Sequence, residues 1–392
     1  MMDKQALQEW VKTGDTFVLE KQQITGDLRG INLSGGVFDQ VDFSDAWLDE
    51  AILKECTFNK CIFNRTRFRK AQLIYCNWVE CQGENIQAQS SHWENASVIN
   101  SFLPSLDLTD SKHKCSSFVD SQLPSSIWHQ VASEQTSLVN CNLQQSHLTE
   151  SRFKNLSAVN SQLDSTLWRG SFLEQCSLVN ASLVAANLTY LSGFRLNLLE
   201  CAFDQAILHH TAIELPFFQK INLSGRDFTQ SGLIKPQFQE CDLSRCNFKG
   251  MDLTQVGMMK AVAIGCDFTG AVLNQANLIE ATLDASVFNH CQLNMALLIK
   301  ASLKKSLFYQ VQAEQAQFTE CDAREAVFTG SNLTYADFSH ALLSKADFSD
   351  TQLNRTNLHE ILDPDTRWRG ANRSAALETD PIRQKAEQQA KS

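Results

Sequence analysis

The sequence has few of the features that mark enzymes. Its 392 residues include only 6 Pro, 16 Gly and 4 Tyr, and none of the motifs G-x-S-x-G, G-x-G-x-x-G, H-E-x-x-H or the P-loop occurs. Its nine His residues form no recognisable constellation. We therefore predict a protein that is not an enzyme, with no catalytic, cofactor-binding or metal-binding residues and no cofactor.

Long apolar runs are also absent. No run approaches the roughly 18 residues of a membrane-spanning helix, and the N-terminal stretch MMDKQALQEWVKTGD lacks the apolar segment of a secretory signal. Without such a signal, the 13 Cys residues indicate reduced thiols. These observations predict a cytoplasmic protein with no membrane span.

Charge of one sign is not concentrated anywhere. The net charge is −10, but Asp and Glu are interspersed with Lys and Arg, and no segment is a charged tail. Binding to a phosphate backbone needs clustered Lys and Arg, so the balance argues against direct nucleic-acid binding.

A strict five-residue period fills most of the chain. Of the 67 positions found at every fifth residue from Leu28 to Leu358, 51 are Leu or Phe. The residues two positions earlier are small, as at Ala51, Cys56 and Cys61. A period of five fits neither a helix nor an ordinary strand. It fits a chain that turns one corner per repeat and points the large and the small residue inward.

The stretch ANLIEATLDASVF, residues 276–288, resembles the pentapeptide-repeat family, whose consensus is close to A-(D/N)-L-x-x. The resemblance covers most of the chain, from Leu28 to Leu358. It implies an all-β solenoid, a right-handed quadrilateral β-helix with four pentapeptides in each coil.

A step of four pentapeptides tests that implication within the sequence. It joins seven Phe residues, which we predict to form one ladder in the core: Phe228, Phe248, Phe268, Phe288, Phe308, Phe328 and Phe348. Trp368 falls in the same row. Like residues stack on like residues when coils are superposed.

One repeated sequence motif and the two ends of the chain indicate how the chain is organised. INLSG begins at Ile31 and again at Ile221. We predict a solenoid segment over residues 24–208, an irregular junction over 209–218 and a second segment over 219–370. The alternative is one solenoid whose narrow consensus produces the match by coincidence. We call the positions at every fifth residue from Leu28 to Leu358 the centres of the repeats. Between Gly83 and Ser133 several centres are neither Leu nor Phe, His113 among them, and this zone could also hold a loop.

Short helical caps are expected at both ends. Residues 1–23 form the N-terminal cap, where Leu7, Trp10 and Val11 share one helical face. Residues 371–392 are either a polar helix, with Asp380 as N-cap and Pro381 in its first turn, or a flexible tail.

Two groups of residues remain as candidate sites. Cys56, Cys61, Cys76 and Cys81 fall on two adjacent coils and offer the ligands of a thiolate metal site, but small buried core residues are the favoured interpretation. A basic patch around Phe68 is a candidate interaction site, with a solvated face paired to nearby acids as the alternative: Arg65, Arg67, Arg69 and Lys70.

These observations favour a non-catalytic scaffold or adaptor rod that binds a protein partner. The family resemblance implies an association with a bacterial effector or type VI secretion system. It also implies an alternative, a DNA mimic that protects gyrase as the quinolone-resistance members do. This chain departs from those members in its length and in the dilution of its acids by Lys and Arg. A homodimer formed through a solenoid end is a further prediction.

Overall fold

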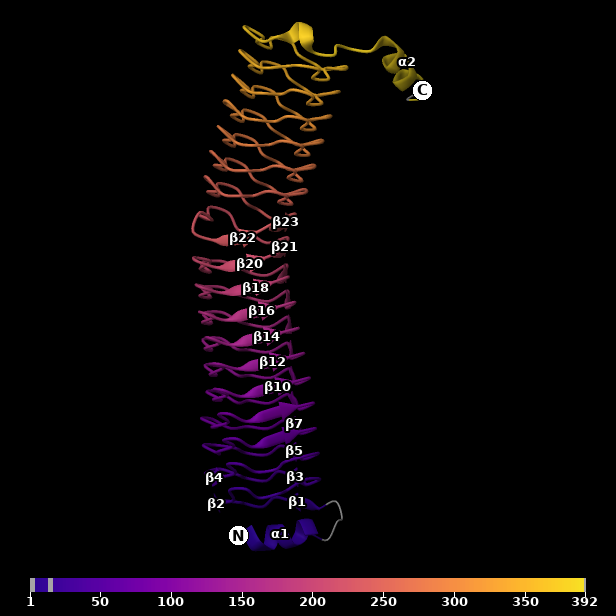
Figure 1. The fold of residues 1–392 in the computed structure, drawn as a ribbon. Helices are drawn as coiled ribbons and strands as arrows, with labels where there is room; N and C mark the ends of the chain where they lie inside the picture. The colour runs from indigo at the N-terminus through magenta and orange to yellow at the C-terminus, as the bar shows by residue number, and fades with distance from the viewer. Residues whose placement is uncertain (1–3, 13–16, 391–392) are drawn as a thin grey trace. The chain divides into compact units, whose positions relative to one another are not determined.

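The computed structural model describes residues 4–12 and 17–390. Its contacts divide the chain into unit 1, Met1–Ile213, and unit 2, Glu214–Ser392 (Figure 1). The two units are described separately below. Among the described residues, no helix has both the length and the apolar content that crossing a membrane would need.

Unit 1 begins with helix α1 (Lys4–Lys12) and continues as short parallel strands on successive faces of a coil. One face contains β1 (Val18–Glu20), β3 (Val37–Asp39), β5 (Thr57–Asn59), β7 (Asn77–Val79), β9 (Ser97–Ile99), β11 (Ser117–Val119), β13 (Ser137–Val139), β15 (Ser157–Val159), β17 (Ser177–Val179) and β19 (Asn197–Leu199). A second contains β6 (Gln72–Ile74), β8 (His92–Glu94), β10 (Lys112–Lys114), β12 (Ala132–Glu134), β14 (Arg152–Lys154), β16 (Phe172–Glu174) and β18 (Ser192–Phe194). The pair β2 (Gly26–Asp27) and β4 (Ala46–Trp47) is separate, and β20 (Ala212–Glu214) lies at the division between the units.

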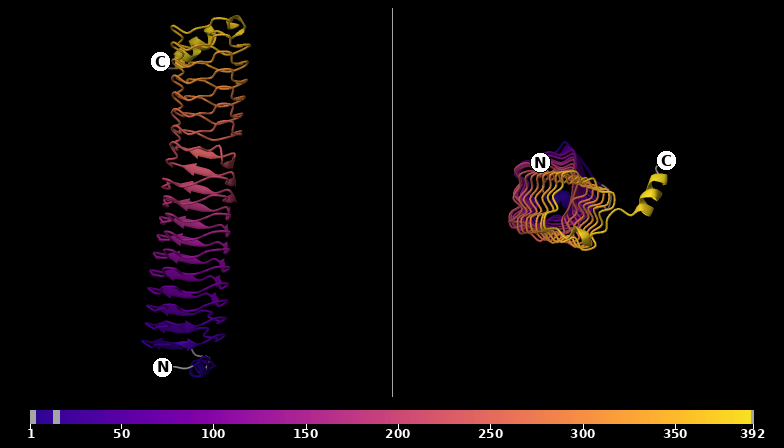
Figure 2. Two further views of the ribbon diagram at one scale, coloured as in Figure 1. Left: turned by 90° about the vertical axis from the view of Figure 1, so that its left-hand side faces the viewer. Right: turned by 90° about the horizontal axis from the view of Figure 1, so that it is seen from above.

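Unit 2 contains β21 (Phe217–Gln219), β22 (Gly232–Ile234), β23 (Gln237–Gln239), the 3₁₀ turn η1 (Arg373–Ala375) and helix α2 (Pro381–Ala390). Beyond β23, its coils are joined by single bridges instead of three-residue strands, up to the bridge from Asn357 to Leu377. Figure 2 shows both patterns, with arrows in the magenta coils and plain loops in the orange ones.

Residues paired between adjacent coils lie a constant distance of one coil apart along the chain. Phe38 pairs with Phe58 in unit 1, and Asp267 pairs with Val287 in unit 2, each partner four pentapeptides further along the chain. Among the pairs of the described residues, those of the first coil depart from this register, since Leu19 pairs with Phe38. The expected all-β solenoid with four pentapeptides per coil is confirmed.

Nearly every corner has a residue in the left-handed backbone region. From Gln40 to Asp365, almost all non-glycine residues at positions whose numbers end in 0 or 5 have φ between 48° and 62°. Many of these residues are Lys, Glu or Gln, for which that conformation costs about 1–2 kcal/mol. The polar corner rows therefore result from exposure to water and not from local conformational preference.

The core consists of the predicted large centres and small residues. The small position also satisfies backbone groups, because its hydroxyl or thiol donates to the carbonyl of a centre in the preceding coil. The Sγ of Cys56 donates to the Leu33 carbonyl over 3.0 Å, and the Oγ of Ser286 donates to the Ala263 carbonyl over 2.7 Å. This bond explains why Ser, Thr and Cys alternate with Ala in this row.

The zones with replaced centres keep the regular pattern. From residue 83 to 133 strands and turns follow one another without a loop, and His113 lies in the core. Residues 209–218 likewise contain a turn, β20 and the start of β21, so their local structure is regular and not irregular. The existence of two separate solenoid segments stays a prediction.

The ends carry the two expected helices. Leu7 of α1 is fully buried, whereas the side chains of Trp10 and Val11 lie outside the described residues. In α2, the Oδ1 atom of Asp380 accepts the backbone N–H of Ile382 over 2.8 Å, as expected for the predicted N-cap. Helix α2 lies beside the coils of unit 2 (Figure 2), and its contact with them is lateral.

Candidate interaction face and C-terminal histidine–glutamate cluster

One face of unit 1 combines regular geometry with an almost complete lack of charge. We call it the Ser–Val face and define it by strands β9, β11, β13, β15 and β17. Each strand begins with Ser, and its third residue is Ile or Val; both positions are half-buried and point outward. The middle residue of each strand points into the core. The face is therefore two parallel rows of small polar and β-branched side chains.

The corner beside the Val row continues the neutral character. The amide of Asn180 donates to the side chain of Asn160 over 2.8 Å, Asn160 donates to Asn140 over 3.3 Å, and Asn140 donates to Asp120 over 2.8 Å. This ladder fixes the orientation of exposed amides along four coils. Asp120 is the single charged residue in it.

The neighbouring face of unit 1 has the opposite character. Its row from Glu94 through Lys114, Glu134 and Lys154 to Glu174 alternates in sign, and Lys154 pairs with Glu174 over 3.5 Å. The two faces share the same coils and the same core. The difference in charge is therefore a property of the outward residues alone.

The predicted basic patch lies at outward corner and strand positions of unit 1, and each of its residues has a polar partner. Arg65 forms two hydrogen bonds with Asp45, of 2.8 and 2.7 Å, and Arg67 bonds Asp49. Lys70 lies 4.0 Å from Glu50, and the guanidinium of Arg69 donates to Gln87. The guanidinium of Arg67 also lies over the ring of Trp47, 4.7 Å from its centroid. The patch is thus a set of pairs between successive coils, and its role as an interaction site stays a prediction.

The four clustered cysteines are buried, and their thiols donate hydrogen bonds to backbone carbonyls: Cys56, Cys61, Cys76 and Cys81. Cys61 and Cys81 donate to the carbonyls of Phe38 and Phe58, each over 3.3 Å. Contact with Cys56, together with burial, raises the pKa of Cys76 far above its ordinary value. Burial also raises the pKa of thiols elsewhere, to about 11 for Cys141 and about 12 for Cys266. A metal ligand is a thiolate, and this environment opposes its formation.

The Phe row of unit 2 is a continuous stack. Adjacent rings from Phe228 to Phe348 have centroids 4.6–5.1 Å apart. Trp368 extends the stack, 4.6 Å beyond Phe348. Every Phe in the row is at most 1% exposed.

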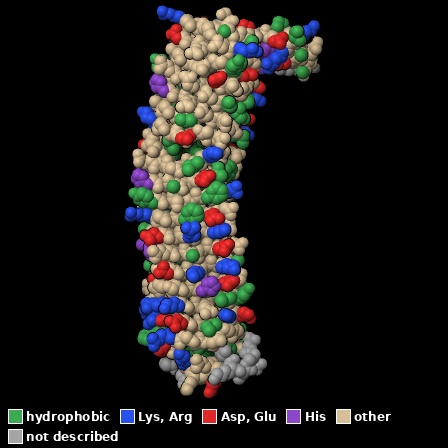
Figure 3. All heavy atoms as spheres, viewed as in Figure 1, with side chains coloured by type: hydrophobic (Ala, Val, Ile, Leu, Met, Phe, Trp, Pro, Cys, Tyr) green, Lys and Arg blue, Asp and Glu red, His purple; other side chains and the backbone are tan. Residues whose placement is uncertain are grey.

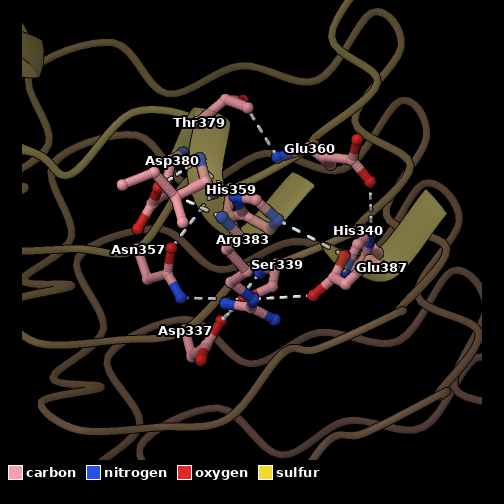
Figure 4. Close-up of polar contacts among 11 residues, drawn as sticks. Asp337, Ser339, His340, Asn357, His359, Glu360, Thr379, Asp380, Arg383 and Glu387 are labelled. Carbon is pink, nitrogen blue, oxygen red and sulfur yellow. Dashed lines mark hydrogen bonds and ion pairs between the residues drawn. The ribbon is translucent and has the colours of Figure 1, made fainter. Parts of the chain in front are cut away.

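A cluster at the C-terminal end of unit 2 brings two imidazoles and two carboxylates together (Figure 4). One ligand atom each from His340, His359, Glu360 and Glu387 lies within 4.8 Å of the others. The Nε2 atom of His340 is 3.1 Å from Glu387, and its Nδ1 atom is 3.4 Å from Glu360. Glu387 belongs to α2, and the other three residues belong to the coils.

The carboxylate of Glu387 is the centre of this cluster. It accepts a hydrogen bond of 2.7 Å from the Nε atom of Arg383 and lies 3.4 Å from the Nε2 atom of His359. These contacts, that with Arg383 first, lower the pKa of Glu387. It is therefore ionised at neutral pH.

A model of pentapeptide repeats matches this chain in 8 copies, over residues 266–304 and 324–359. These residues form coils of unit 2 with the one-coil register described above. The chain therefore contains pentapeptide repeats. No curated protein matched its sequence.

Solved structures similar to this chain include QnrB1, a plasmid-mediated fluoroquinolone resistance protein. QnrB1 is 17% identical, and the match covers 61% of this chain and 97% of QnrB1, with a TM-score of 0.21. HetL, a pentapeptide repeat protein involved in heterocyst differentiation regulation in the cyanobacterium Nostoc sp. strain PCC 7120, is 17% identical over 59% of this chain and 91% of HetL, with a TM-score of 0.20.

The histidine–glutamate cluster was not predicted from the sequence. A usable signal was the corner row of unit 2, read at steps of one coil, which alternates in sign: Lys260, Glu280, Lys300, Glu320, His340 and Glu360. That row places His340 beside Glu360. Nothing in the repeat predicts Glu387, because it lies on a helix outside the repeats.

Proposed function

We propose that this pentapeptide-repeat protein is a non-catalytic scaffold that binds a protein partner through the Ser–Val face of unit 1. The observation that carries the proposal is the uniform row of Ser and of Val or Ile across five strands, beside a charged face on the same coils. Outward positions of a coil accept any polar residue. A face kept free of charge over five coils therefore calls for a reason other than folding.

Physical chemistry favours a protein as the ligand of this face. Ser and Val have few rotamers, so ordering them on binding costs little entropy. A partner that covers them desolvates hydroxyl and methyl groups but no charge, and charged residues are typically depleted at the core of protein interfaces. The hydrogen-bonded amides from Asn140 to Asn180 supply oriented polar groups at the rim.

The test adds one charge to this face. Ser137→Lys places an ammonium in the middle of the Ser–Val face, and Ala132→Lys places one on β12 of the same coil, as a matched control. Partners would be cross-linked in cells of the native host, identified by mass spectrometry and then titrated as purified proteins. We expect Ser137→Lys to weaken binding at least about tenfold, the cost of burying an unpaired charge. The control should bind normally.

A partner that binds the wild type and Ser137→Lys equally well would refute the role of this face. Equal loss with both variants would refute it as well, since added charge anywhere on the coil would then be the cause. Circular dichroism of both variants checks that the coils remain folded.

The DNA-mimic alternative lacks a supporting observation of this kind. In the corner row of unit 2, Glu280 pairs with Lys260 over 3.7 Å, and Glu320 pairs with Lys300 over 3.6 Å. In Figure 3, Lys and Arg side chains lie beside Asp and Glu side chains on the face in view. A mimic of a phosphate backbone needs unpaired acids, so we favour the scaffold.

For the cellular location of the scaffold we propose only a type of compartment. All 13 cysteines are free thiols, which supports a reducing compartment such as the cytoplasm. The association with an effector or secretion system has no residue in this chain that selects it.

A further inference from the structure

The wall of unit 2 is open on one side, next to β22. This strand is the last of its sheet, and in the described part of unit 2 no bridge joins it to the following coil. The adjoining sides of the same coil stay paired. The N–H of Phe228 donates to the Asn247 carbonyl over 2.9 Å, and that of Phe238 donates to the Gly257 carbonyl over 2.6 Å. The opening is therefore confined to one side of one contact between coils.

The next contact between coils on this side shows which bonds are missing. There the N–H groups of Leu253 and Gln255 donate to the carbonyls of Val272 and Asn274 over 2.7 and 2.9 Å. The N–H of Val272 in turn donates to the Met251 carbonyl over 2.9 Å. Among the described residues, the three equivalent bonds one coil earlier are absent.

The groups that would form these bonds lie on both edges of the opening. On one edge they are the N–H groups of Leu233 and Lys235 and the carbonyl of Ser231. On the other edge they are the N–H of Asp252 and the carbonyls of Asp252 and Thr254. Backbone groups without a partner in the protein bind water or another chain. An edge that carries such groups is a template for an added strand.

The two corners that flank β22 depart from the regular turn. In a regular corner the small residue donates to the preceding centre, as the N–H of Val256 does to the Leu253 carbonyl over 3.0 Å. Pro236 occupies the equivalent position after β22 and has no N–H to donate. At the corner before β22, Gln230 does not have the left-handed φ of the regular corners. The departure of this side from the stack thus has a local cause in the chain.

The opening forms a cleft of about 480 Å³ between residues 229–235 and residues 249–254, which we call the β22 cleft. In Figure 1 the ribbon beside β22 bulges from the stack of coils. At one corner of the cleft, the Nε2 atom of Gln237 bridges the two coils by donating to the carbonyls of Lys235 and Gln255 over 3.2 and 3.3 Å. Because the adjoining sides stay paired, a single extended segment can enter the cleft, but the edge of a second solenoid cannot.

The side chains of the β22 cleft favour an acidic segment. Its lining contains two lysines, Lys235 and Lys249, and one acid, Asp252. Lys235 is exposed, and no acidic side chain of the described residues pairs with it. Ile234 is 54% exposed and Met251 is half-buried, so both can contact an apolar side chain. The cleft therefore offers backbone groups, one free positive charge and a small apolar surface.

We propose that the β22 cleft binds an extended, acidic peptide segment of a partner protein as an added strand. Strand β22 has 3 residues, so a segment of similar length would replace the missing bonds between the coils. A carboxylate of the segment pairs with Lys235, and an apolar side chain packs on Ile234 and Met251. The site lies in unit 2 and does not depend on the partner proposed for the Ser–Val face of unit 1.

A peptide library tests this proposal on the full-length protein. Short random peptides displayed on phage are selected on the immobilised wild type, and enriched peptides are synthesised with capped ends and titrated by fluorescence anisotropy. We expect these peptides to contain Asp or Glu. Hydrogen exchange reports where they bind: the amides of Leu233 and Asp252 should exchange rapidly in the free protein and at least about tenfold more slowly with saturating peptide, whereas the paired amide of Leu253 should not change.

Two pairs of variants separate strand addition from other binding. Asp252→Pro removes the N–H that faces the cleft, and Asp252→Ala removes the same carboxylate but keeps the N–H. Proline is compatible with a strand position whose N–H is unpaired. We expect Asp252→Pro to weaken binding about tenfold, because a backbone acceptor of the peptide is left without a donor, and Asp252→Ala to bind as the wild type. Lys235→Glu should weaken binding of acidic peptides, whereas Lys345→Glu, at another exposed corner of unit 2, should not.

Enriched peptides that bind Asp252→Pro as tightly as the wild type would overturn the proposal. So would a selection on the wild type that enriches no peptide beyond those obtained on Asp252→Pro. An amide of Leu233 that exchanges as slowly as that of Leu253 in the free protein would show that the edge is closed, and would also refute the site. If circular dichroism shows that Asp252→Pro does not fold, Lys235→Glu decides, and binding equal to that of Lys345→Glu refutes the proposal.

Discussion

Replacing His113 by Leu should remove a pH-dependent loss of stability from unit 1. The imidazole is the central side chain of β10 and is 3% exposed. It lies between the rings of Trp93 and Trp128, with centroids 5.7 and 5.4 Å away. Its Nε2 atom is 3.0 Å from the Oγ of Ser111, and its buried Nδ1 atom has no hydrogen-bond partner.

The magnitude follows from the cost of charging this ring. Burial, with a smaller effect of His92, lowers the pKa of His113 from 6.5 to about 3. The unfolded chain therefore binds the proton below pH 6.5 while the folded chain does not, and stability falls as the pH falls from 6.5 toward 3. At pH 5 the unfolded state gains about 2 kcal/mol from this proton, at about 1.4 kcal/mol per pH unit. Above pH 6.5 the contribution is nearly constant.

The assay is urea unfolding at pH 7 and pH 5, followed by tryptophan fluorescence, since Trp93 and Trp128 flank the site. Other groups also titrate, so the quantity of interest is the difference between variant and wild type. The His113→Leu variant should lose about 2 kcal/mol less than the wild type between the two pH values. The exposed His147 is the matched control, and His147→Gln should follow the wild type.

An identical pH dependence in the wild type and in His113→Leu would refute the reasoning. That result would mean that the buried ring is charged in the folded state or that the neighbouring coil opens to solvate it. A change in stability that is equal at both pH values would report packing only.

Three further predictions about the fold can be tested by urea unfolding. Phe288→Ala removes one ring from the stack and should cost about 3–5 kcal/mol, and Phe288→Leu should cost much less. Ala285→Gly should stabilise unit 2 by about 1 kcal/mol because its φ is 57°, whereas the same change at Ala132, on a strand, should destabilise. Ser151→Ala should cost about 1–3 kcal/mol, because its Oγ accepts a buried N–H over 2.9 Å and donates to a buried carbonyl; no loss would refute this role of the small inward residue.

The solenoid could be predicted because its cause is local and repeated. A centre such as Phe288 is apolar at every fifth residue, and Phe268 and Phe308 repeat it one coil away, so one row of the core can be read from the chain alone. The corner geometry could not be read in this way. Residues such as Lys300 and Glu320 have no preference for φ > 0, and only the turn of the coil imposes it.

The two candidate sites also differ in how much of each could be predicted from the sequence. The uncharged rows from Ser97 to Val179 are visible in the sequence as neutral segments, but only the coils align them into one face. His340, His359 and Glu387 follow one another at unequal spacings that no repeat period predicts. Their meeting depends on where α2 lies.

The sequence by itself determined the five-residue period, the coil of four pentapeptides and the buried Phe row, since apolar burial acts on every repeat alike. Tertiary structure alone decided that the small residues satisfy carbonyls one coil away, as with Cys56 and Leu33. It also decided that His340 lies between two carboxylates. Those contacts join atoms from different coils or from a helix outside them, and their energy exists only once the coils have stacked.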